Sequence, residues 1–252
     1  MKTPFDKIYV ITCPSFKERF LFVNNQLKDL GICNYSFIWG SDLGNFKKDS
    51  LGYKIQWPQL WEYEHNCTGR DFGCTLSHYD AIYQSYEFGY EKILIIEDDI
   101  CFIKNKELLE VILNNIPNDA DFVTYDPRFW FDKDFNQFYN DIKTSNYYIK
   151  DKYNFMFGSM MYGIMNRKSM NLYLNNQRKN LFIADHVQGF FCNVSVNKYV
   201  CTKCLCTDQF NIENNFDYTK KNKAYKNNYK DNENLKISDF YIPEKYQSFL
   251  RT

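Results

Sequence analysis

An aliphatic run that ends in three consecutive acids is the feature that most constrains this chain. Residues 92–99 read KILIIEDD, and an unbroken run of β-branched and aliphatic side chains is typical of a strand buried on both faces of a parallel sheet. Adjacent carboxylates repel one another and are costly to desolvate unless a positive charge lies beside them. A divalent cation would supply that charge, because magnesium, manganese and calcium prefer oxygen ligands. The alternative is an ordinary acidic loop after a core strand, since strand ends are often polar.

The pattern of apolar residues elsewhere predicts alternating strands and helices. Residues 7–11 and 35–39 are predicted strands, and an amphipathic helix lies between them, with apolar residues recurring every three or four positions from Phe16. We expect Ser15 to cap the start of this helix and Gly31 to end it. Strand, helix and strand in this order indicate a βαβ unit and therefore a parallel sheet. Further helices are predicted around residues 76–86, 108–112 and 167–176, and further strands at 122–125 and within 153–165.

Composition limits the classes of partner and compartment. The 252 residues include 31 basic and 31 acidic side chains, so no net charge favours a nucleic-acid partner. No signal peptide and no bilayer-spanning run is evident, and we therefore expect a cytoplasmic protein whose 9 cysteines are mostly free thiols. A zinc site at Cys201, Cys204 and Cys206 is disfavoured, because the spacing is irregular and no matching Cys/His pair follows. Both a monomer and a homodimer remain open.

A second motif precedes the acidic strand and carries a family resemblance. The chain resembles the family 25 glycosyltransferases, the group of lipooligosaccharide and procollagen galactosyltransferases, whose pattern is Gly-Glu-x-Gly-Cys-x-x-Ser-His, a helix, and an aliphatic strand ending in Glu-Asp-Asp. The chain departs from the pattern at Arg70 and Asp71, where the family usually has Gly and Glu. The resemblance covers residues 7–103 and fades beyond them. The matching positions are Gly73, Cys74, Ser77, His78, Glu97, Asp98 and Asp99, with Arg19 after the first strand.

The resemblance implies an α/β, GT-A-like nucleotide-binding fold with a central, mostly parallel sheet flanked by helices. Residues 1–216 would form a single glycosyltransferase domain, with a nucleotide-sugar and metal half at 1–103 and an acceptor half at 104–216. Residues 217–252 form a polar C-terminal segment rich in Lys and Asn.

Each candidate site residue then has an expected role. Glu97 and Asp99 stand in for the outer acids of the family's Asp-x-Asp motif and would hold Mn²⁺ or Mg²⁺, because alternate side chains of a strand share a face. If the chain turns sharply after the strand, Asp98 and Asp99 would be the ligands instead. The remaining candidates are Arg19, Ser77, His78 and Asp98 for binding the donor, His186 as a third metal ligand, Asp185 as the general base, and Asp208 as the alternative for either of the last two roles.

The reaction implied by the resemblance is an inverting transfer of a hexose, galactose or else glucose, from a UDP-sugar. The acceptor hydroxyl would belong to a glycan, such as a lipooligosaccharide, or to hydroxylysine in a collagen-like chain. A metal held by carboxylates would neutralise the pyrophosphate leaving group. Two other classes remain open: a metal-dependent phosphoesterase using the same acids, and a catalytically inactive protein that binds sugar nucleotides or glycans.

Overall fold

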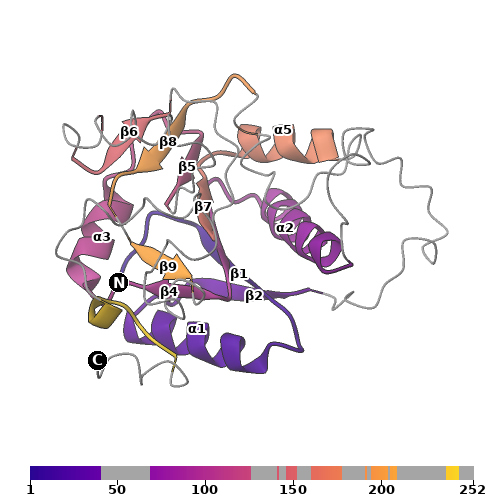
Figure 1. The fold of residues 1–252 in the computed structure, drawn as a ribbon. Helices are drawn as coiled ribbons and strands as arrows, with labels where there is room; N and C mark the ends of the chain where they lie inside the picture. The colour runs from indigo at the N-terminus through magenta and orange to yellow at the C-terminus, as the bar shows by residue number, and fades with distance from the viewer. Residues whose placement is uncertain are drawn as a thin grey trace.

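The computed structural model describes residues 1–40, 69–125, 141, 146–151, 160–177, 191, 194–203, 205–208 and 237–243. Within these ranges a seven-stranded sheet forms the centre of the molecule, in the order β2-β1-β3-β7-β5-β8-β6 (Figure 1). A second, two-stranded sheet pairs β4 with β9. The strands are β1 (Lys7–Thr12), β2 (Tyr35–Trp39), β3 (Ile93–Glu97), β4 (Ile100–Phe102), β5 (Phe122–Thr124), β6 (Tyr148–Lys150), β7 (Met161–Ile164), β8 (Lys198–Cys201) and β9 (Cys206–Asp208).

The large sheet is mixed but mostly parallel, as an α/β, GT-A-like fold requires. Strand β1 pairs in parallel with β2 on one side and with β3 on the other, which confirms the predicted βαβ unit. Strand β5 also runs parallel to β8, whereas β7 and β6 are antiparallel to their neighbours. The acidic strand β3 is thus parallel to β1 but antiparallel to β7. The aliphatic sequence of β3 does not predict which neighbour is antiparallel, because burial on both faces is independent of the direction of the neighbouring strands.

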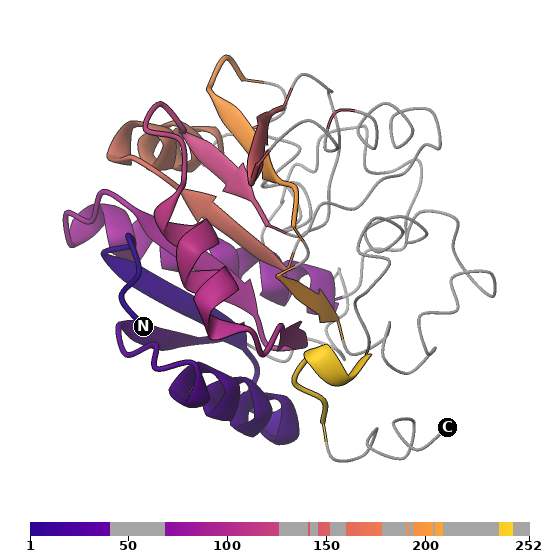
Figure 2. The ribbon, with the colours of Figure 1, turned by 90° about the vertical axis from the view of Figure 1, so that its left-hand side faces the viewer.

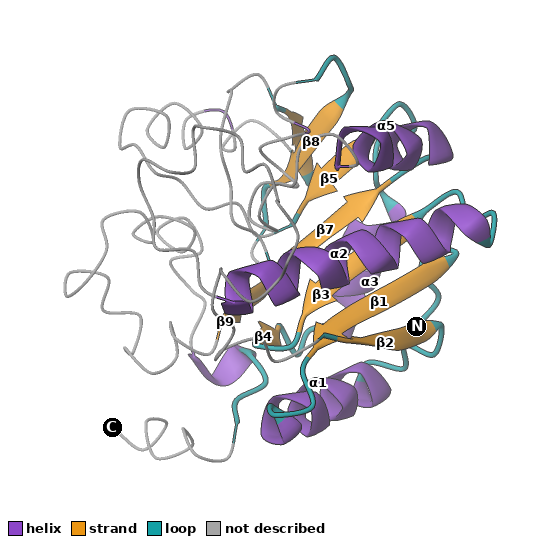
Figure 3. Ribbon diagram, turned by 90° about the vertical axis from the view of Figure 1, so that its right-hand side faces the viewer, coloured by secondary structure: helices purple, strands orange, loops and turns teal. Residues whose placement is uncertain are grey.

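Helices cover both faces of the sheet and make three layers. One apolar cluster lies between the sheet and helices α1 (Lys17–Asp29) and α3 (Lys106–Asn114). The other lies between the sheet and helices α2 (Gly69–Glu87) and α5 (Arg167–Gln177). Figure 2 shows the α1 and α3 side, and Figure 3 shows α2 lying across the opposite face with α5 beside it. Alternate residues of β1 and β3 enter opposite clusters, which explains why the runs of both strands are apolar throughout.

The helix ends agree with the sequence in part. Helix α1 begins at Lys17, and its N-cap is Phe16 without a side-chain cap, so the expected cap at Ser15 is wrong. Gly31 follows the helix with φ of 69°, and Gly89 follows α2 with φ of 78°. Glycine adopts this left-handed conformation without steric cost, so the predicted end of α1 at Gly31 is confirmed. None of the helices in the described ranges is both long and apolar enough to cross a membrane.

Part of the predicted C-terminal segment packs on the domain. The short 3₁₀ helix η4 (Ile237–Asp239) leads into Phe240, which is buried in the same cluster as α1 and α3. The backbone of Phe240 forms a β-bridge with Ile103, directly after β4. The Tyr241 N–H also donates to the Phe102 carbonyl at 2.9 Å. Residues near the end of the chain therefore pair with the backbone at the end of β4.

Candidate active site

The candidate site lies where the parallel strands β1, β2 and β3 end together. Ile11 of β1 is in register with Glu97, the last residue of β3, and Thr12 follows Ile11. Just after β2, the Gly40 N–H donates to the Thr12 carbonyl at 2.7 Å. Asp98 and Asp99 form the turn between β3 and β4. Parallel strand order therefore gathers polar residues from distant parts of the sequence at one edge, which is where open α/β sheets bind ligands.

Asp98 is the buried acid of this edge. Its side chain accepts a hydrogen bond of 2.6 Å at Oδ2 from the Thr12 hydroxyl, and the residue is only 5% exposed. Arg19 Nη1 lies 3.6 Å from Oδ1. Desolvation raises the pKa of Asp98 above its ordinary value, the Thr12 hydrogen bond and the Arg19 charge oppose that rise, and the Glu97 charge adds to it. The carboxylate is thus a charge that the fold buries and partly compensates.

Arg19 joins the two acids of the turn. The guanidinium comes from the first turn of α1 and lies 3.6 Å from Asp99 Oδ2 as well as from Asp98. It also lies over the ring of Phe16, 5.0 Å from the ring centre. Asp98 and Asp99 therefore share one cation, which is the arrangement expected if the chain turns sharply after the strand. Arg19 remains 40% exposed in its side chain, so it can also contact a bound anion.

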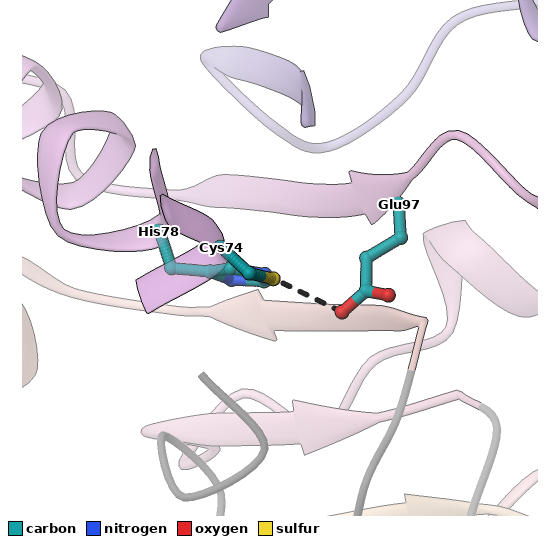
Figure 4. Close-up of side chains that lie close together, drawn as sticks. All are labelled: Cys74, His78 and Glu97. Atoms are coloured by element: carbon teal, nitrogen blue, oxygen red, sulfur yellow. Dashed lines mark ion pairs between the residues drawn. The ribbon is translucent and has the colours of Figure 1, made fainter. Parts of the chain in front are cut away.

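Glu97 faces a different set of residues. Its Oε1 lies 3.4 Å from His78 Nε2, and the ligand atoms of Cys74, His78 and Glu97 all lie within 4.8 Å of one another. Figure 4 shows the Cys74 and His78 side chains, both from α2, directed at the Glu97 carboxylate. On the other side of the ring, His78 Nδ1 lies 2.6 Å from the Tyr162 hydroxyl of β7. The three consecutive acids thus divide between two groups of partners.

Ser77 packs the start of α2 against the strand ends. Its hydroxyl donates to the Gly73 carbonyl at 2.8 Å, one turn earlier in the helix. A Cβ placed on Gly40 would lie 2.6 Å from the Ser77 hydroxyl, so only glycine fits beside it. Ser77 is 3% exposed. It lies against the backbone of α2 and beside Gly40, and its expected contact with the donor stays a prediction.

The late candidates are described only in part. Asp185 and His186 lie outside the described residues. The backbone of Asp208 ends β9 and pairs with Ile100, which directly follows the acidic turn. Asp208 therefore lies on a strand adjacent to the site, although it is distant from Asp98 and Asp99 in the sequence.

The cysteines of the C-terminal half fit the expectation of buried thiols. Cys201 and Cys206 are both buried and are not in a disulfide, and Cys204 is outside the described residues. Burial raises the pKa of Cys201 to about 12, and its thiol lies 3.3 Å from the Lys203 carbonyl, to which it donates. A thiol with so high a pKa stays protonated and unreactive at neutral pH.

Sequence reasoning missed several residues that the structure brings to the site. Thr12 and Gly40 carried only the weak signal of lying at strand ends, and Tyr162 carried none, because its place beside His78 depends on the pairing of β7 with β3. Cys74 was recognised as part of the family motif but was given no role, although it stands four residues before His78 and side chains at this spacing lie on the same face of a helix.

Comparison with known proteins places these residues in a family. The sequence model of glycosyltransferase family 25, described as an LPS biosynthesis protein, matches residues 5–236. Among solved structures, the chain is similar to the crystal structure of A197 from STIV, with 13% identity and a TM-score of 0.35 over 77% of this chain and 80% of that one. No curated protein matches the chain. The family match covers most of the chain, including the Gly73–His78 motif and the acidic strand end, and the chain belongs to glycosyltransferase family 25.

Proposed function

We propose that this glycosyltransferase is an inverting, metal-dependent enzyme that transfers a hexose from a UDP-sugar to an acceptor hydroxyl. The observation that carries the proposal is the meeting of three consecutive carboxylates with Arg19 and His78 at the carboxyl edge of β1 and β3. Galactose is the expected sugar and glucose the second choice. The acceptor would be a glycan, in keeping with the family's description, or hydroxylysine in a collagen-like chain.

The acidic turn has the right donors for a hard divalent cation. Asp99 is the more accessible of the two, with its side chain 29% exposed, while Asp98 is buried. Arg19 lies 3.6 Å from both acids, and burial still raises the pKa of Asp98. A second positive charge would therefore stabilise the site, and carboxylate oxygens suit Mn²⁺ or Mg²⁺. We assign Asp99, supported by Asp98, to this ion, in preference to the Glu97 and Asp99 pair, because Glu97 faces His78; His186 stays the candidate third ligand.

Charge neutralisation is what the bound ion would supply to the leaving diphosphate. Arg19 would contact the same diphosphate through the part of its guanidinium that faces solvent. Thr12 holds the Asp98 carboxylate in place through its hydrogen bond. These contacts favour departure of UDP without any covalent participation by the protein.

The transfer itself needs one proton acceptor. The acceptor oxygen forms a bond to the anomeric carbon while the bond from that carbon to the diphosphate oxygen breaks, and the hydroxyl proton passes to a carboxylate. Asp185 is the proposed base, and Asp208 is the alternative, which gains support from its backbone pairing beside the acidic turn. Loss of a positioned base lowers the rate by about 10²–10⁴-fold.

Thermal unfolding with UDP, UDP-galactose and UDP-glucose, each with manganese or with a chelator, tests the donor site first. A ligand at about 100 times its dissociation constant adds about 2.7 kcal/mol to stability, which shifts the melting temperature visibly. We expect a manganese-dependent shift with UDP and a larger one with a single sugar nucleotide. Asp99→Asn should lose the manganese dependence while it melts like the parent protein without ligand. A retained manganese-dependent shift in Asp99→Asn would contradict the metal assignment.

Product analysis then separates the transferase from the other two classes. Transfer of the sugar to an added acceptor, with UDP released in equal amount, supports the proposal. Cleavage at phosphorus, which would give UMP and sugar 1-phosphate or inorganic phosphate, would indicate a phosphoesterase, and binding without turnover would indicate an inactive binding protein. Asp185→Asn and Asp208→Asn should be compared in this assay, because only the variant that lacks the base should bind donor normally and transfer slowly.

A further inference from the structure

We propose that Cys74 Sγ, His78 Nε2 and the Glu97 carboxylate form a second metal site, which binds a borderline-soft divalent ion such as Zn²⁺. This site is separate from the cation proposed for the acidic turn and does not depend on it. It uses a thiolate, an imidazole and a carboxylate, whereas the acidic turn offers oxygen donors alone. The argument rests on the geometry of the three ligand atoms and on the surroundings of His78.

The three ligand atoms are already close to the spacing that one ion needs. In a tetrahedral zinc site, with bonds of about 2.0–2.3 Å, neighbouring ligand atoms lie about 3.3–3.8 Å apart. His78 Nε2 and Glu97 Oε1 are 3.4 Å apart, and all three ligand atoms lie within 4.8 Å of one another. Cys74 and His78 share one face of α2, since they are four residues apart on the helix. A small rotation of the Cys74 side chain would therefore complete the triangle.

The state of His78 Nε2 is the second observation that indicates a bound ion. The His78 side chain is 1% exposed, and Nε2 has no hydrogen-bond partner among the residues that the structure describes, since its 3.4 Å contact with Glu97 lacks the geometry of a hydrogen bond. A buried polar atom left in this state is destabilising, and nearly all such atoms in folded proteins are satisfied. A metal ion between His78, Glu97 and Cys74 would satisfy Nε2 and lie directly on the side of the ring that faces the other two ligands (Figure 4).

The opposite side of the ring also has a hydrogen-bonding partner, as metal-binding histidines usually do. His78 Nδ1 lies 2.6 Å from the Tyr162 hydroxyl, and the two rings stack at 5.7 Å with an angle of 13° between them. With a metal on Nε2, the proton resides on Nδ1 and is donated to the Tyr162 oxygen. Outer partners of this kind hold the ring in place and fix its tautomer. His78 is therefore oriented toward Cys74 and Glu97 by contacts that need no metal.

The donor set selects the class of ion. Thiolate and imidazole ligands favour Zn²⁺ and similar transition metals, while Mg²⁺ and Mn²⁺ prefer oxygen. Three protein ligands leave a fourth position for water or for an oxygen of another molecule, as in zinc sites that bind an exchangeable ligand. Glu97 precedes Asp98 directly, so an ion held here would adjoin the proposed donor site.

Cobalt titration of the metal-free protein tests the site without relying on activity. Co²⁺ substitutes for Zn²⁺, and a cobalt-bound thiolate gives a charge-transfer band in the near ultraviolet. We expect this band to saturate at one ion per chain and to be displaced by Zn²⁺. Cys74→Ser should abolish it, and the matched control Cys33→Ser, at an exposed cysteine, should retain it. Glu97→Gln should bind cobalt at least ~10-fold more weakly, because even outer partners of metal ligands contribute about 10–100-fold in affinity.

Three results would contradict the metal site, and one of them would leave the proposed function intact. Absence of a thiolate band in the parent protein, or a band that survives Cys74→Ser, would overturn the site. Parent protein that shows the manganese-dependent UDP shift but no thiolate–cobalt band would contradict this site and leave the proposed function standing. Unfolding curves of the metal-free variants show whether a lost band reflects a lost ligand or a lost fold, and Glu97→Gln supplies the answer if Cys74→Ser does not fold.

Discussion

At the scale of single residues, the Thr12 hydroxyl stabilises the buried acid of the site. It donates a 2.6 Å hydrogen bond to the buried Asp98 carboxylate, whose pKa is raised by desolvation. The hydrogen bond stabilises the charged form of the acid and so lowers this pKa toward its ordinary value. Arg19 acts in the same direction from solvent. A single hydroxyl therefore helps to keep a negative charge in a largely buried position.

Thr12→Val should destabilise the protein, and increasingly so as the pH rises. A hydrogen bond to a charged group contributes about 1.5–3 kcal/mol. The pKa of Asp98 in the folded state is raised above the ordinary 3.8, and the variant raises it further, so ionisation of Asp98 costs the variant more stability. The cost is smallest where Asp98 is protonated in both states and grows as the pH rises from about 4 toward neutrality. Chemical unfolding of both proteins at several pH values measures the difference.

Asp98→Asn supplies the control for this prediction. In that background Thr12 has no carboxylate to stabilise, so adding Thr12→Val should cost much less than it does in the parent protein, and its cost should no longer change with pH. An equal, pH-independent cost in both backgrounds would show that Thr12 acts by packing alone.

At the scale of elements, one buried amide connects a helix to the strand after the acidic turn. Gln26 of α1 is 1% exposed. Its Nε2 donates to the Ile100 carbonyl at 3.0 Å, and its Oε1 accepts from the Phe102 N–H at 2.8 Å. These two hydrogen bonds hold α1 against β4, and β4 begins directly after Asp99. The position of the acidic turn thus depends on a side chain that lies in a different layer of the fold.

Gln26→Leu should lower stability strongly although leucine fits an apolar core. It leaves the Ile100 carbonyl and the Phe102 N–H buried without their partner, at about 1–3 kcal/mol for each group. Gln84→Leu, at an exposed position of α2, is the matched control and should change stability little. Urea unfolding of the three proteins makes the comparison. Similar urea midpoints for Gln26→Leu and Gln84→Leu would show that the hydrogen bonds from Gln26 to β4 do not stabilise the fold.

At the scale of the whole molecule, a residue near the C-terminus packs in the same apolar cluster as the first strand. Phe240 is 1% exposed and packs in the cluster that also contains residues of β1, α1 and α3. The Lys104 N–H donates to the Asp239 carbonyl at 2.7 Å, and the Tyr241 N–H donates to the Phe102 carbonyl. The family match ends at residue 236, so this packing lies beyond the matched region.

Phe240→Ala should therefore destabilise the entire domain and not merely release a tail. Removal of a buried phenylalanine side chain costs about 3–5 kcal/mol. Phe88→Ala removes the same atoms at a position that is 69% exposed and should cost far less. Thermal unfolding followed by near- and far-ultraviolet circular dichroism measures both. A melting temperature for Phe240→Ala equal to that of Phe88→Ala would show that the C-terminal residues add nothing to the core.

The sequence predicted the long elements well because their patterns are local. The apolar stripe of α1, the opening β1 strand and the run of β3 each repeat over several residues, and all three form where they were expected. The short strands β4, β6 and β9 have three residues each and were not predicted. The equally short β5 was predicted because its residues are apolar and β-branched or aromatic, whereas a three-residue strand without such a run has no pattern to recognise and depends on its partner strand.

The sequence alone determined the family, the α/β class and the identity of the acids, because each depends on residue types at fixed spacing. It could not decide how those acids pair. Glu97 lies beside His78 and Cys74, whereas Asp98 and Asp99 share Arg19. That division depends on the turn after β3, on the rotation of α2 over the sheet and on the placement of α1 at its edge. Side-chain pairing between distant segments is a property of their packing, and only the tertiary structure decided it.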